Sequence, residues 1–63
     1  MERKIFELYL RQKVKVRMKN NWKHEGVLSN IMGDNILIED IVVGETWINM
    51  DSVMTIQKCE NGK

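Results

Sequence analysis

Four basic side chains occur at every second position of one short stretch, namely Lys13, Lys15, Arg17 and Lys19. Alternate residues of an extended strand point to the same face, so this spacing predicts a row of positive charge along one strand. Such a row attracts phosphate groups without reading base sequence. Alternatively, the row is a solvated face that keeps a strand edge from pairing with other chains. Both interpretations stay open, with Lys15 and Arg17 as the candidate phosphate contacts.

The charge of the chain is unevenly distributed, although the net charge is only +1. Residues 1–24 hold eight Lys or Arg and two acidic residues, which gives a net charge of +6. Residues 25–63 hold two Lys and seven acidic residues, which gives −5. The N-terminal part therefore predicts a basic surface on an otherwise nearly neutral chain.

Residue types suited to catalysis or metal binding are few. The chain has one His, His24, and one Cys, Cys59, so it holds no set of His and Cys ligands and no internal disulfide. His24 has no acidic residue at a catalytic spacing in the sequence, and we interpret it as an exposed strand residue. Because there is also no nucleophile–base pair and no phosphate-binding loop, we expect a protein that is not an enzyme and needs no cofactor.

The elements that position these residues are predicted to be mostly β. Apolar residues at Ile5, Leu8 and Tyr9 have helical spacing and indicate a short helix over about residues 2–12. Strands are expected over about residues 13–19, 22–31, 35–43, 45–50 and 53–58, all within one domain that covers residues 1–63. They would form a strongly bent antiparallel sheet that curls into a small barrel.

The bend is assigned to Gly26, which lies inside the second predicted strand. Glycine weakens a strand and often marks a sharp bend or a close approach of another backbone. Asn20 and Asn21 tolerate left-handed backbone, so they predict the turn between the first two strands. Trp22 follows that turn and is interpreted either as a stacking platform for a base or as a partly buried strand residue.

Association with further copies follows from the small size of the chain. A core of this size rarely supplies more than about 3–5 kcal/mol, and the fourth and fifth strands would expose unpaired edges. Pairing these two strands between copies removes both edges, and such a contact closes into a ring or grows into a fibre. We therefore predict a homo-oligomeric ring whose interface contains five apolar residues: Trp47, Ile48, Val53, Met54 and Ile56.

No apolar run approaches the ~18 residues that a membrane span needs, and nothing is typical of a signal peptide. We expect a cytoplasmic protein without a membrane partner.

Taken in order, residues 5–57 resemble the Sm/LSm family, which includes the bacterial protein Hfq. The family's first motif is an alternating strand, a turn, a strand with a glycine, and a loop before an apolar strand. It is matched by Val14, Val16, Met18, Gly26, Leu28, Asn35, Ile36, Leu37 and Ile38. The second motif is matched by Trp47, Ile48, Val53 and Ile56. The spacing from Gly26 to Ile36 is closer to Hfq than to the eukaryotic and archaeal members.

The resemblance implies an SH3-like or Sm-like barrel and a hexameric or heptameric ring that binds single-stranded RNA at its pore. It implies that Asp34, Asn35 and Asn49 contact bases, because they lie in the two family loops that do so. The sequence departs from the family there, since the loop at residues 32–35 has no aromatic residue and Asn49 stands where the family has Arg or Lys. A barrel that serves as a protein–protein interaction or assembly module without RNA binding is the alternative function.

Overall fold

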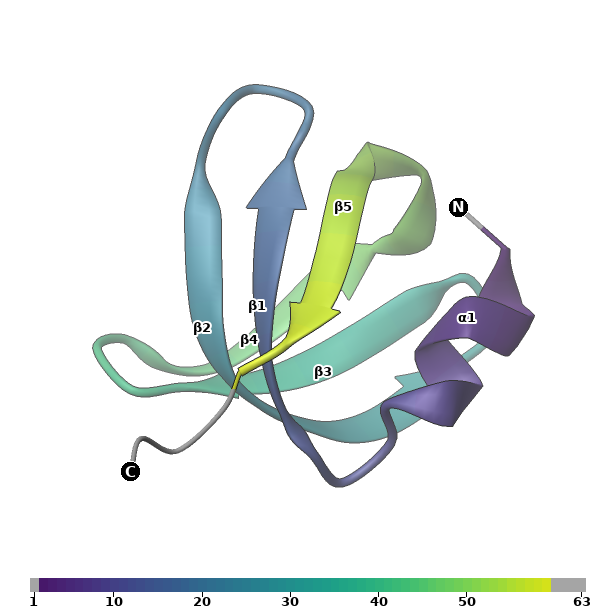
Figure 1. The fold of residues 1–63 in the computed structure, drawn as a ribbon, viewed down its shortest axis with the longest axis horizontal. Coiled ribbons are helices and arrows are strands. Elements are labelled where there is room, and N and C mark those ends of the chain that lie inside the picture. Colours follow the sequence, from purple (N-terminus) through teal and green to yellow (C-terminus); the bar gives the residue numbers. More distant parts are fainter. Residues whose placement is uncertain (1, 60–63) are drawn as a thin grey trace.

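The computed structural model describes residues 2–59, which form a short helix followed by five strands (Figure 1). The elements are α1 (Arg3–Leu8), β1 (Lys13–Met18), β2 (Lys23–Met32), β3 (Asn35–Asp40), β4 (Gly44–Asn49), the 3₁₀ turn η1 (Met50–Ser52) and β5 (Val53–Lys58). The predicted mostly β class with an N-terminal helix is confirmed, and the topology is compatible with the Sm fold.

The five strands form one antiparallel sheet in the order β4-β3-β2-β1-β5. The two edges are therefore β4 and β5, as the sequence predicted. No ladder between β4 and β5 closes the sheet within residues 2–59, so closure into a barrel is not observed. Both edge strands keep one side free for pairing.

The sheet is strongly bent, because β2 runs beside β1 and then curves so that its second half lies along β3 (Figure 1). Gly26 pairs with Val14 on one side and with Asp40 on the other. A Cβ atom at Gly26 would overlap the backbone carbonyl of Glu39 and lie 2.9 Å from the Cα atom of Asp40. Only glycine fits this close approach of β3, as the strand interpretation of Gly26 predicted.

The core lies between the concave face of the sheet and α1, and its buried residues are Phe6, Val14, Val16, Leu28, Ile36, Ile38, Ile48, Met50 and Val53. The alternation along β1 buries Val14 and Val16 as predicted. None of the helices in residues 2–59 is long and apolar enough to cross a membrane.

The helix is shorter than predicted, since α1 ends at Leu8 and not near residue 12. Arg11 has a positive φ of 68°, and its backbone N–H donates to the carbonyl of Leu28 on β2. This bond turns the chain away from the helix axis and into β1. Leu8, one of the apolar residues whose spacing predicted the helix, is exposed.

The third strand also ends earlier than predicted, at Asp40 and not at residue 43. The Asp40 side chain accepts hydrogen bonds from the backbone N–H groups of Val42 and Val43, and Gly44 follows with a positive φ of 83°. These bonds favour a turn over strand propagation. Ile41, Val42 and Val43 therefore form an exposed turn between β3 and β4.

Candidate functional site

Three of the predicted RNA contacts, Asp34, Asn35 and Asn49, meet at one end of the sheet. Asn35 and Asn49 are partners in the β3–β4 register. The Met50 N–H donates to the Asp34 carbonyl oxygen over 2.8 Å, which joins the β2–β3 turn to the start of η1. Met50 is buried in the core and anchors this junction. All three predicted contact residues are exposed, so their polar groups are accessible to a ligand.

The Asn49 side chain already has one partner, because its Oδ1 accepts the Asp51 N–H over 2.8 Å and caps η1. The amide nitrogen Nδ2 is left as a donor. Asn49 can therefore donate to a ring nitrogen or a carbonyl oxygen of a base without losing its cap. Asn35 carries both an amide donor and a carbonyl acceptor.

Lys15 and Arg17, the predicted phosphate contacts, lie on a different surface. In the β1 ladders Lys15 is opposite Glu25 and Gln57, and Arg17 is opposite Lys23 and Thr55. Together with Lys23, they line a shallow depression of about 180 Å³. Glu25 lies in the half of β2 that runs along β1, whereas Asn35 pairs with Met32 at the far end of β2, beyond the bend at Gly26. The predicted RNA contacts therefore fall into two separate groups.

The predicted interface residues are divided between the core and the surface. Trp47 and Met54 are exposed on the two edge strands, and Ile56 is half-buried. Ile48 and Val53 are buried in the core of the same chain. Because their side chains already pack inside, Ile48 and Val53 are not available to a second copy.

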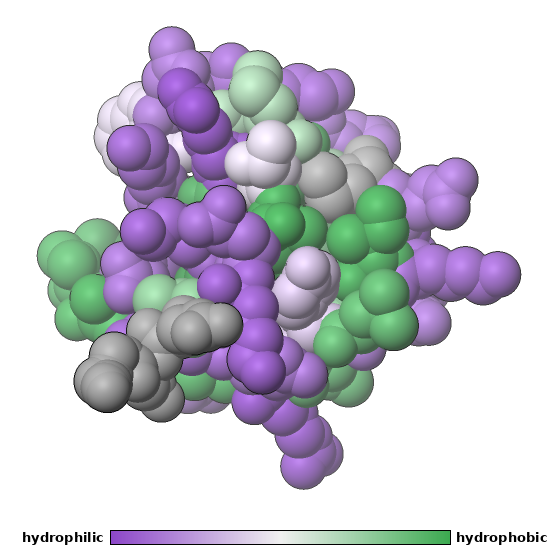
Figure 2. Space-filling view, viewed as in Figure 1, coloured by the Kyte–Doolittle hydropathy of each residue, from purple (hydrophilic) through white to green (hydrophobic). Residues whose placement is uncertain are grey.

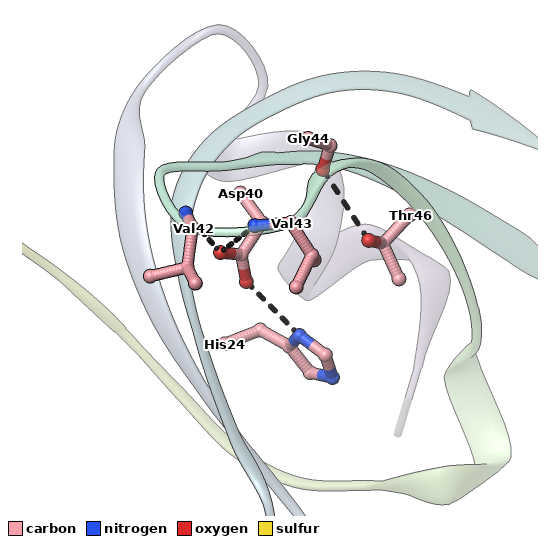
Figure 3. Close-up of polar contacts among 6 residues, drawn as sticks. All are labelled: His24, Asp40, Val42, Val43, Gly44 and Thr46. Carbon is pink, nitrogen blue, oxygen red and sulfur yellow. Dashed lines mark hydrogen bonds and ion pairs between the residues drawn. The ribbon is translucent and has the colours of Figure 1, made fainter.

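His24 is not the exposed residue that the sequence predicted. Its Nδ1 lies 3.1 Å from Oδ2 of Asp40, and the two side chains are only 17% and 8% exposed (Figure 3). The pair was missed because the two residues are 16 positions apart in sequence. The β2–β3 hairpin brings Asp40 opposite Gly26, and a diagonal neighbour two residues away is within reach of a side chain.

The pKa of the Asp40 carboxyl is lowered from its ordinary value of 3.8, chiefly because the Val42 N–H donates to the carboxylate. Burial opposes this shift, while His24 and the Val43 N–H add to it. The carboxylate is thus held in its charged form at the start of the β3–β4 turn.

Substituting Asp40 with Asn should reduce the free energy of unfolding by about 1 kcal/mol near neutral pH, because a charged acceptor is replaced by a weaker neutral one. A lowered pKa stabilises the fold above the unfolded value of 3.8 and loses this effect as the pH falls through the folded value. The difference between wild type and variant should therefore shrink on acidification. Urea unfolding over this pH range measures it, with Asp34→Asn as the exposed control; a difference independent of pH would contradict the assignment.

A groove of about 430 Å³ lies beside the His24–Asp40 pair. Trp22, which precedes β2, is 67% exposed at this groove and is therefore not the partly buried strand residue of one interpretation. The exposed turn at residues 41–43 forms another part of the lining.

Comparison with known proteins does not assign the chain to a family: no family model, no curated protein and no solved structure matches it.

Proposed function

We propose that this protein is an Sm-like, non-enzymatic protein that assembles into a homo-oligomeric ring and binds single-stranded RNA. The observation that carries the proposal is the meeting of Asn35 and Asn49 at one end of the sheet. Their exposed amides lie at the first residue of β3 and the last residue of β4, and the hydrogen bond between Met50 and Asp34 joins the adjacent β2–β3 turn and η1. Amide groups pair with the edges of unstacked bases, which is how single-stranded RNA is read.

The two free edges support the assembly part of the proposal. A contact between β4 of one copy and β5 of the next would satisfy their free backbone groups and bring Trp47 and Met54 toward apolar surroundings. The same pairing, repeated around a ring, would place the Asn35–Asn49 end of every copy about one axis. In this arrangement the bent sheet acts as an Sm-like barrel.

Native mass spectrometry of the purified chain tests both parts in one experiment. We expect a hexamer or heptamer that retains A-rich or U-rich oligonucleotides at low ionic strength. Trp47→Glu should break the ring, because it places a charge at an edge contact, whereas Leu8→Glu on the exposed side of α1 should not. A stable monomer at micromolar concentration would contradict the assembly.

Two kinds of substitution should separate phosphate contacts from base contacts. Replacing Lys15 and Arg17 together with Gln should weaken all RNAs about equally and reduce the salt dependence of log K by about 1.4, as expected for two lost phosphate contacts on a single strand. Asn35→Ala should change the preference among bases and leave the salt dependence nearly the same. Fluorescence anisotropy in a series of salt concentrations measures both quantities. An equal salt dependence in wild type and double variant would remove Lys15 and Arg17 from the interface.

An interaction or assembly module without RNA binding is the second candidate. It is favoured by the lack of an aromatic residue in the β2–β3 turn, since stacking supplies about 1–3 kcal/mol per base in single-strand binding. A ring that retains no oligonucleotide at low ionic strength would support this candidate over the first.

A further inference from the structure

The groove beside the His24–Asp40 pair gathers an apolar cluster that the core does not use. It consists of four large, exposed side chains: Trp22, Ile41, Val42 and Val43. Val42 is 84% exposed, and apolar side chains project at the side of the molecule where the β3–β4 turn lies (Figures 1 and 2). Contiguous exposed apolar surface of this kind marks interaction sites.

The turn that presents the cluster is held in one conformation by its own hydrogen bonds (Figure 3). Oδ1 of Asp40 accepts the N–H groups of Val42 and Val43 over 2.7 and 3.2 Å, and Oδ2 is bonded to His24. The Ile41 N–H donates to the carbonyl of Glu25 on β2 over 3.1 Å. A surface fixed in this way loses little conformational entropy when a ligand binds.

The basic side chains around the groove are free to contact a ligand, whereas the acidic side chains already have partners within the chain. Within residues 2–59, Lys15 and Lys23 form no ion pair, and the adjoining depression adds Arg17 to them. The two acidic residues of the lining are engaged, because Asp40 holds the turn and Glu25 lies 3.8 Å from the Lys13 ammonium. Free positive charge therefore borders an apolar surface.

We propose that this groove binds an acidic segment of a partner protein that carries a large apolar side chain. The apolar side chain packs against Trp22 and the turn, while the carboxylates of the segment lie near Lys15, Lys23 and Arg17. This complementarity favours peptide over nucleic acid. Three of the four exposed apolar side chains of the groove, Ile41, Val42 and Val43, are aliphatic. An apolar side chain of a peptide can cover them, whereas the charged sugar–phosphate backbone of a nucleic acid cannot. The groove is separate from the Asn35–Asn49 end but shares Lys15 and Arg17 with the phosphate contacts proposed above. Peptide binding there does not depend on base recognition by Asn35 and Asn49.

Selection from a random peptide library displayed against the purified full chain tests the proposal. We expect enriched peptides in which Asp or Glu residues flank a large apolar residue. Synthetic versions should bind with an affinity that decreases with salt. Val42→Ser should weaken them about tenfold, in the range of an anchor contact, and Lys15→Gln with Lys23→Gln should remove most of the salt dependence. Val42 is outside the core, so its variant should fold; Leu8→Ser, at an exposed apolar residue of α1 outside the groove and outside the proposed ring contact, is the matched control.

Four results would overturn the proposal. Enriched peptides that lack acidic residues would show that the basic side chains do not contribute to binding. Peptides that bind Val42→Ser as tightly as wild type would show that binding occurs outside the groove. Loss of oligonucleotide binding in Val42→Ser, with displacement of the peptide by RNA, would assign the groove to nucleic acid. Self-association that is lost in Val42→Ser would assign it to a second copy of the chain. Failure of RNA binding or of ring formation alone leaves the peptide measurements intact, so the two proposals are distinguishable.

Discussion

Gly26→Val is expected to reduce the free energy of unfolding by about 2 kcal/mol or more, at the upper end for single substitutions. An added Cβ would overlap the carbonyl of Glu39, and backbone atoms of a paired strand cannot move aside without disturbing the ladder. A core this small rarely supplies more than about 3–5 kcal/mol, so the variant should retain only a small part of the wild-type stability and melt at a clearly lower temperature. Thermal unfolding followed by circular dichroism measures the effect.

Gly33→Ala is the matched control for this substitution. Gly33 lies in the β2–β3 turn with a φ of 58°, and no heavy atom outside Gly33 and its two chain neighbours lies within 4 Å of the position where its Cβ would be. The cost there is limited to the left-handed backbone conformation, which is about 1 kcal/mol. Equal melting temperatures of Gly26→Val and wild type would show that the paired backbones tolerate a side chain at the bend.

Phe6→Ala is expected to have the other large effect, a loss of about 3–5 kcal/mol. Phe6 is fully buried and is the residue through which α1 enters the core. Because α1 has only six residues, the helix cannot persist without this packing. The remaining cavity would lie within the core cluster to which Phe6 belongs. Urea unfolding of the two proteins measures the difference.

Leu8→Ala tests whether burial is the cause. Leu8 lies on the same helix but is 74% exposed, so its truncation should change the free energy of unfolding by no more than about 0.5 kcal/mol. A similar loss in both variants would show that the exposed side of α1 is covered by another surface, such as a second copy of the chain.

Features that depend on local periodicity could be predicted from the sequence. The alternation of Val14 and Val16 places one face of β1 in the core, because a strand repeats every two residues. Asn21 has the left-handed backbone expected of its turn, with a φ of 73°. Gly26 was identified because glycine weakens a strand and therefore often marks a bend or a close approach of another backbone. The two open edges followed from counting the strands and their order along the chain.

Features that depend on which distant segments become neighbours required the tertiary structure. The bond between His24 and Asp40 arises from the β2–β3 register, and no spacing along the chain indicates it. That contact belongs to a turn that ends β3 early and exposes Val42 and Val43, although their sequence is typical of a strand. Side-chain hydrogen bonds to the backbone compete with the ladder there, and the local pattern of apolar residues does not reveal them.

The same limit applies to the candidate site. The types of Asn35 and Asn49, and their places near two turns, were visible in the sequence, but their pairing across β3 and β4 was decided by the fold. The fold also decided which of the predicted interface residues are buried. Ile48 and Val53 were predicted to lie at the interface between copies, but they pack inside the chain. Side-chain periodicity states which residues share a face. Only the curvature of the sheet decides which part of that face is covered by the rest of the chain.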